Sequence, residues 1–121
     1  MPLDDVSRLL HMRDAARAAL KFMENVERAE LGSNLQLVFA VVKAVEIIGE
    51  AAANVSSSTR EQYSQIPWYL IVGMRNRLVH GYFDVDLDQV WSTVTEDLPP
   101  LLVELEKILP DVPPDYRSPF V

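Results

Sequence analysis

The chain of 121 residues contains no cysteine, which excludes both disulfide bonds and thiolate metal sites. Positive charge is also scarce. Eleven lysine and arginine residues stand against 18 aspartate and glutamate residues, so the net charge is −7. Broad binding to nucleic acid depends on neutralising phosphates, and this balance argues against it. A nucleic-acid site in this chain would have to be one local basic cluster.

Long hydrophobic runs are missing as well, because charged residues interrupt them well before the roughly 20 residues that a membrane span needs. The N-terminal stretch MPLDDVSRLL lacks a basic segment followed by an apolar run, so we expect no signal peptide, no membrane association and a cytoplasmic protein. The 49% hydrophobic content predicts one globular domain. We expect this domain to span residues 1–109, and the proline-rich residues 110–121 to form an extended tail.

Helical periodicity predicts two long helices in the first half of the chain. The first is expected from Asp4 to about Glu27, capped by the pair Asp4-Asp5. The second is expected to run to about Val55, opened by a capping box of Ser33 and Gln36. A short capped turn is expected near Ser58. The second helix is apolar on nearly every side, which indicates a core helix or one shared with a second subunit.

The second half predicts two more helices. One should start at Pro67, continue through His80 and stop at Gly81. The next should start after the capping residue Asp86 and be kinked or briefly broken at Pro99-Pro100. No stretch alternates in the manner of a strand. We therefore predict an all-α, antiparallel bundle of four main helices.

The stretch GMRNRLVHGYF (residues 73–83) gathers several polar side chains among apolar ones. On an unbroken helix, Tyr69, Gly73, Asn76 and His80 share one face, with Gly73 leaving a gap that a ligand or another backbone could approach. Arg75 would point roughly 140° away from His80 at ~100° per residue. Either the arginine bends round the helix, or a dimer brings together two copies of the cluster. We favour the dimer.

Structural explanations of the same residues stay open on spacing alone. A histidine in the last turn of a helix suits the helix dipole. Arg75 could form a buried ion pair with Glu46 or Glu50, and Tyr82 could be a packing anchor. Three alternating aspartates could suggest a metal site, but they stand where a helix N-terminus favours negative charge: Asp84, Asp86 and Asp88.

The segment Arg75–Tyr82 has the form R-N-x-x-x-H-x-Y, which resembles the signature of HEPN domains. It is most similar to the HepT-type toxin that is paired with a minimal nucleotidyltransferase antitoxin. Three further segments resemble that family in the same order: AVEIIGEAA (44–52), IPW (66–68) and VWSTVTEDLPPLL (90–102).

The resemblance implies a homodimeric, metal-independent endoribonuclease that needs no cofactor and cleaves an RNA substrate. Arg75 and His80 would be catalytic, with Asn76 and Arg77 in supporting roles. Tyr82 would be the tyrosine to which the nucleotidyltransferase antitoxin adds AMP. Because HEPN domains include non-catalytic members, a nucleotide- or partner-binding helical module associated with a nucleotidyltransferase is the alternative.

Overall fold

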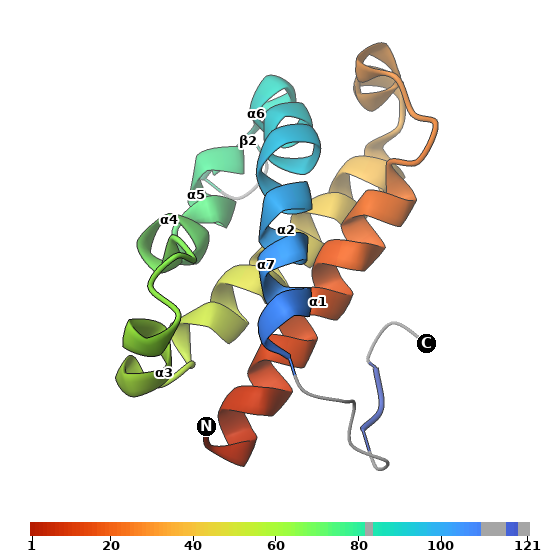
Figure 1. The fold of residues 1–121 in the computed structure, drawn as a ribbon. Coiled ribbons are helices and arrows are strands. Elements are labelled where there is room, and N and C mark those ends of the chain that lie inside the picture. The colour runs from red at the N-terminus through yellow and green to blue at the C-terminus, as the bar shows by residue number, and fades with distance from the viewer. Residues whose placement is uncertain (82–83, 110–115, 119–121) are drawn as a thin grey trace.

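The computed structural model describes residues 1–81, 84–109 and 116–118 (Figure 1). Helices α1 (Leu3–Phe22) and α2 (Leu35–Ala53) lie side by side and run in opposite directions. Helices α4 (Trp68–Val72) and α5 (Met74–Leu78) pack against α2, and α7 (Leu98–Ile108) packs against α1. The predicted all-α bundle is confirmed, with a small two-stranded hairpin added to it.

The first helix is shorter than the sequence pattern predicts. It begins at Leu3 and ends at Phe22 rather than at Glu27. Beyond it, Asn25 takes a φ of 61°, a left-handed conformation that a right-handed helix cannot contain. The N-terminus of α1 has no side-chain cap, so the capping role expected of the pair Asp4-Asp5 was wrong.

Asp5 instead joins α1 to the short helix α3 (Ser57–Gln62). Its side chain is only 2% exposed and accepts hydrogen bonds from the Ser56 amide at 3.0 Å, the Ser56 hydroxyl at 2.5 Å and the Thr59 hydroxyl at 2.6 Å. Burial raises the pKa of Asp5, but these hydrogen bonds outweigh it and hold the pKa below its usual value. Ser56, rather than the predicted Ser58, is the residue that caps α3.

The start of α2 also lies one residue from the prediction. A 3-10 helix, η1 (Arg28–Ser33), precedes it and buries Leu31 against the core. Asn34 then caps α2 by accepting a hydrogen bond from the Leu37 amide at 3.0 Å. Ser33 bonds back to the Glu30 carbonyl and is therefore not the cap.

The third predicted helix is divided into three pieces. Gly73 separates α4 from α5, and α5 ends at Leu78 rather than at Gly81. Strand β1 (Val79–His80) then pairs antiparallel with β2 (Asp84–Val85), with His80 opposite Asp84. The prediction that His80 lies on the helix was wrong. The chain reverses at Gly81, whose φ of +76° favours glycine.

The last helical segment starts as predicted. Asp86 caps α6 (Leu87–Ser92) by accepting a hydrogen bond from the Gln89 amide at 3.1 Å. A π-helical turn, η2 (Thr93–Asp97), connects α6 to α7. Pro99 and Pro100 stand in the first turn of α7, so the predicted break takes the form of this wider turn just before the prolines.

Within the described residues, no helix is long and apolar enough to cross a lipid bilayer. Most of the proposed tail lies outside these residues, at 110–115 and 119–121. Residues 116–118 are described, and they lie against α1, where the Tyr116 hydroxyl donates a hydrogen bond to Asp14. The division at residue 109 stays a prediction.

Candidate functional site

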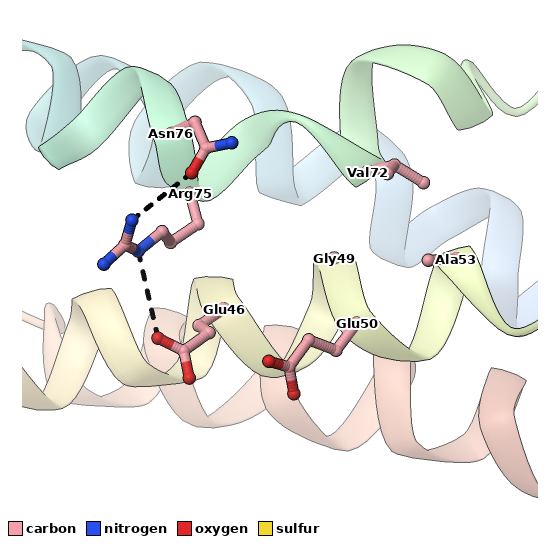
Figure 2. Close-up of a pocket in the computed structure, with 7 residues that line it drawn as sticks. All are labelled: Glu46, Gly49, Glu50, Ala53, Val72, Arg75 and Asn76. Atoms are coloured by element: carbon pink, nitrogen blue, oxygen red, sulfur yellow. Dashed lines mark hydrogen bonds and ion pairs between the residues drawn. The ribbon is translucent and has the colours of Figure 1, made fainter.

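A pocket of about 380 Å³ lies between α2 and the α4–α5 segment, and it contains Arg75. Figure 2 shows Arg75 extending from α5 toward the face of α2 that carries Glu46 and Glu50. Four polar or charged residues and three small or apolar ones line it: Glu46, Glu50, Arg75 and Asn76, with Gly49, Ala53 and Val72. Two of the four predicted catalytic and supporting residues, Arg75 and Asn76, therefore share one open pocket.

The guanidinium of Arg75 is held loosely. Its Nε lies 3.9 Å from Glu46 Oε2, and both side chains are about one third exposed, at 34% and 31%. A second contact joins Arg75 Nη1 to the Asn76 side-chain oxygen at 3.3 Å. The ion pair with Glu46 considered from the sequence is thus present, but it is long and solvent-accessible rather than buried. Such exposed pairs contribute little to stability.

Glu46 has a closer partner on its own helix. Lys43 Nζ lies 2.9 Å from Glu46 Oε1, one helical turn away. The hydrogen bond to Glu46 raises the pKa of Lys43, and the charge of Glu46 adds to this effect. The carboxylate is therefore shared between a lysine and an arginine. Because the positive charge of Lys43 partly neutralises the Glu46 carboxylate, the electrostatic attraction between Glu46 and Arg75 is further reduced.

Gly49 lets α2 approach this site closely. A Cβ atom at Gly49 would lie 3.2 Å from the carbonyl oxygen of Ile71 and 3.3 Å from that of Val72. Contacts this short with backbone oxygen are rare for real Cβ atoms, so glycine suits the position. This role of Gly49 was not predicted from the sequence. A glycine within an apolar helical segment was the signal that could have indicated a close helix contact.

Gly73 was predicted to leave a gap that a ligand or another backbone could approach, and within the chain it makes only ordinary contacts. A Cβ atom there would meet Arg77 Nη1 at 3.6 Å and the Tyr69 carbonyl at 3.8 Å, which are ordinary contacts. The expected gap is covered by Arg77, whose guanidinium also donates to the Leu70 carbonyl at 2.9 Å. Arg77 lines a different pocket, between α4 and α7, and so is not gathered with Arg75.

His80 is exposed and lies on β1, two residues beyond the end of α5. The hairpin that carries it is fixed by the β1–β2 pairing and by a 2.8 Å hydrogen bond from the Asp86 amide to the Leu78 carbonyl. The helical angle of roughly 140° between Arg75 and His80 does not apply, because the helix ends between them. Tyr82 lies outside the described residues.

The three alternating aspartates have separate roles. Asp86 caps α6, and Asp88 forms a hydrogen bond with Arg28 at 2.8 Å. Asp84 lies opposite His80 in the hairpin. Within residues 1–81, 84–109 and 116–118, no three side chains of the kinds that bind metals come together.

The all-α bundle and the Arg-x4-His motif agree with the HEPN-type domain that the sequence resembles. The chain belongs to the HepT-like ribonuclease family: the family model described as "Ribonuclease HepT-like" matches residues 12–108.

Curated relatives agree with this assignment. The chain is 35% identical over 113 residues to a Methanocaldococcus jannaschii protein named "Putative RNase MJ1216", an alignment that covers 93% of each chain. It is 44% identical over 70 residues to "Probable ribonuclease HepT" of Thermococcus cleftensis, covering 58% of this chain and 64% of that one. No solved structure gives a significant match.

Proposed function

We propose that this protein is a metal-independent endoribonuclease toxin that uses Arg75 and His80 to cleave RNA. Membership of a ribonuclease family supports the reaction class. The observation that carries the proposal for this chain is that the guanidinium of Arg75 is solvent-accessible and only weakly paired. This guanidinium lines a solvent-open pocket, and its ion pair with Glu46 is long, at 3.9 Å, so a phosphate group can displace that carboxylate. A fixed, fully buried ion pair would not allow this.

The chemistry needs one proton acceptor, one proton donor and one fixed positive charge. The RNA 2′-hydroxyl attacks the adjacent phosphorus while a base removes its proton. The bond to the 5′-oxygen then breaks, and an acid protonates that oxygen. The products are a 2′,3′-cyclic phosphate end, which water can open, and a 5′-hydroxyl end. An imidazole titrates near neutral pH and can serve as base or acid, while a guanidinium suits the phosphate oxygens.

A dimer would place two copies of the motif at one seam. Exposed apolar side chains lie on both helices that form the pocket: Leu35 and Phe39 on α2, with Tyr69 and Val72 on α4. An isologous contact through these faces would bury them and supply two histidines, one as base and one as acid. Light scattering should find a dimer for the wild type and a monomer for Phe39→Glu. A monomeric wild type with full activity would contradict this arrangement.

We further propose that a partner nucleotidyltransferase neutralises the toxin by modifying Tyr82. The tyrosine oxygen would attack the α-phosphorus of ATP, releasing pyrophosphate and leaving AMP on the ring. The added phosphate would compete with RNA for Arg75, and the nucleoside would obstruct the site. Radiolabel from [α-³²P]ATP should enter the wild type but not Tyr82→Phe. Equal labelling of the two proteins would reject Tyr82 as the target.

The central test is cleavage of single-stranded RNA in the presence of EDTA. We expect His80→Ala to lower the rate by about 10²–10⁴-fold and Arg75→Ala by about 10²–10³-fold. His11→Ala is the matched control, since His11 is the other histidine of the sequence and should leave the rate unchanged. Full activity in pure His80→Ala would remove His80 from the mechanism. RNA binding without any cleavage by the wild type would favour the non-catalytic binding module instead.

A further inference from the structure

A second groove, of about 710 Å³, lies between α1 and residues 116–118. Figure 1 places these residues beside α1, at the opposite edge of the bundle from α4 and α5. The groove is therefore separate from the pocket that holds Arg75. Its lining includes four cationic side chains: Arg13, Arg17, Lys21 and Arg117.

We propose that this groove, the α1 groove, binds the backbone of single-stranded RNA and so holds the substrate at a distance from the cleavage site. The proposal rests on the ribonuclease function proposed above. Its first support is the local charge. Four of the eleven lysine and arginine residues of the chain line this one groove, and Asp14 is the one acidic residue among the nine that line it. The groove is thus locally basic in a protein whose net charge is −7.

The spacing of these charges suits a linear anion. Arg13, Arg17 and Lys21 follow each other at intervals of four residues, so they form a row along one face of α1. Successive members stand about 6 Å apart along the helix axis. A compact anion would need donors that converge on one point. Arg13 is only 12% exposed, but Arg17 and Lys21 are exposed and match successive phosphates of a chain.

The floor of the groove is held in place by Asp14. This carboxylate is buried and accepts hydrogen bonds from Arg13 at 2.9 and 3.0 Å and from the Tyr116 hydroxyl. Burial raises the pKa of Asp14, but the bonds from Tyr116, Arg13 and Ser118 outweigh it, so the pKa lies below its usual value. Asp14 therefore stays ionised at neutral pH and anchors residues 116–118 against α1. It also neutralises Arg13, which leaves phosphate contacts mainly to Arg17 and Lys21.

An aromatic side chain completes the set of groups that single-stranded nucleic acid uses. Phe22 lines the groove next to Lys21 and is 41% exposed. Proteins that bind single strands combine a basic groove with aromatic rings on which bases stack. RNA engages both features at once, the cations through its phosphates and the ring through its bases. RNA is therefore the ligand that accounts for both features.

The carboxylate of Glu106 would compete with an RNA phosphate for Arg17, and a substitution of Glu106 can remove this competition. Arg17 Nη2 lies 3.0 Å from Glu106 Oε1 on α7, and both side chains are about half exposed. An exposed pair of this kind is weak and can yield to a phosphate. Glu106 therefore limits RNA binding at the α1 groove, and its neutralisation should strengthen binding.

Binding can be measured without cleavage in the His80→Ala background. The probe is a fluorescent oligouridylate of roughly 16 nucleotides, a length typical of larger single-strand sites. The variant pair Arg17→Ala and Lys21→Ala should weaken binding about ten-fold. It should also lower the slope of log affinity against log salt by about 1.4, because each lost phosphate contact contributes about 0.7 on a single strand.

Two controls separate this groove from general charge effects. Lys107→Ala removes another exposed lysine, one that is paired with Glu104, a residue of the pocket on the other side of α7, and should leave the affinity unchanged. Glu106→Gln should tighten binding. Circular dichroism should report the same helicity for all variants, since alanine favours helix.

Equal affinity and equal salt slope in the Arg17→Ala, Lys21→Ala protein would overturn the proposal. The failure of the ribonuclease function looks different: the wild type would bind the oligonucleotide with the predicted salt dependence but would not cut it. If both hold, the same pair of substitutions in the active enzyme should raise KM for long RNA several-fold. It should leave kcat unchanged, because the reacting groups lie at the opposite edge of the bundle.

Discussion

Gly49 and Ile71 bring two backbones into direct contact. A Cβ atom at Gly49 would stand 3.2 Å from the Ile71 carbonyl oxygen, and no flexible side chain lies between them to yield. Helix α2 therefore packs on α4 at the closest distance that a glycine permits, directly beside the pocket that contains Arg75.

Replacing Gly49 by alanine should destabilise the protein and misplace Arg75. Alanine improves helix propensity by about 1 kcal/mol, but the new methyl group must push α4 away from α2. We expect a net loss of about 1–2 kcal/mol in the free energy of unfolding, together with reduced RNA cleavage. Urea denaturation and single-turnover kinetics measure the two effects. Gly73→Ala is the matched control and should change stability by less than about 0.5 kcal/mol, since a Cβ atom there makes only ordinary contacts.

Asp5 should be the most sensitive polar residue of the fold. Asp5→Ala leaves the Ser56 amide and the buried Thr59 hydroxyl without their acceptor, at a cost of about 1–3 kcal/mol for each unsatisfied group. We expect a total loss of about 3 kcal/mol by urea denaturation. Asp5→Asn keeps one acceptor oxygen and should cost about half as much. Equal, small losses in both variants would show that α3 is anchored by its apolar contacts instead.

Acid should weaken the protein partly through the same residue. The folded-state pKa of Asp5 lies below the usual value of 3.8, so its stabilising effect is complete above that value and is lost as the pH falls through the folded-state pKa. The pKa of Asp14 is shifted in the same direction. Between about pH 5 and pH 2, the free energy of unfolding should fall less steeply in Asp5→Asn than in the wild type. Parallel curves would contradict the assignment.

Neutralising Glu46 should improve substrate binding. The carboxylate lies 3.9 Å from Arg75 and competes with an incoming phosphate. For Glu46→Gln we expect KM for RNA to fall about two- to five-fold, the range that an exposed ion pair supports, with little change in kcat. Asp88→Asn also removes one negative charge, but from the surface pair with Arg28, and should leave KM unchanged. A large fall in kcat for Glu46→Gln would mean that Glu46 positions Arg75 instead.

The sequence was sufficient for the parts of the fold that depend on local signals. Helical periodicity identified the bundle, and Asp86 with Gln89 marked the start of α6 correctly, because the capping carboxylate and the amide that donates to it lie only three residues apart. The predictions from the sequence failed where contacts between residues far apart in the chain determine the local structure. Asp5 looked like a helix cap, but its partners are Ser56 and Thr59, more than 50 positions away.

The catalytic roles of Arg75 and His80 stay predictions, and the helical geometry expected for them was wrong. The motif identified Arg75 and His80, and the pairing of Arg75 with Glu46 was anticipated as one structural alternative. Helical periodicity carried the helix two residues too far, because Val79 and His80 form a hairpin with partners that follow a reversal at Gly81. Helical spacing places residues on a common face only within a continuous helix. Because α5 ends at Leu78, His80 does not share a helix face with Asn76.

Because α5 ends at Leu78, the two residues of the Arg-x4-His motif lie on two different secondary-structure elements. Arg75 lies on helix α5, which packs on α2, whereas His80 lies on the two-residue strand β1 of the hairpin. The separation of the two side chains therefore depends on the backbone conformation at the end of the helix, between Leu78 and Val79. Substitutions in the hairpin can retune the reach of the imidazole while the guanidinium keeps its place, so one half of the motif can evolve without rebuilding the other.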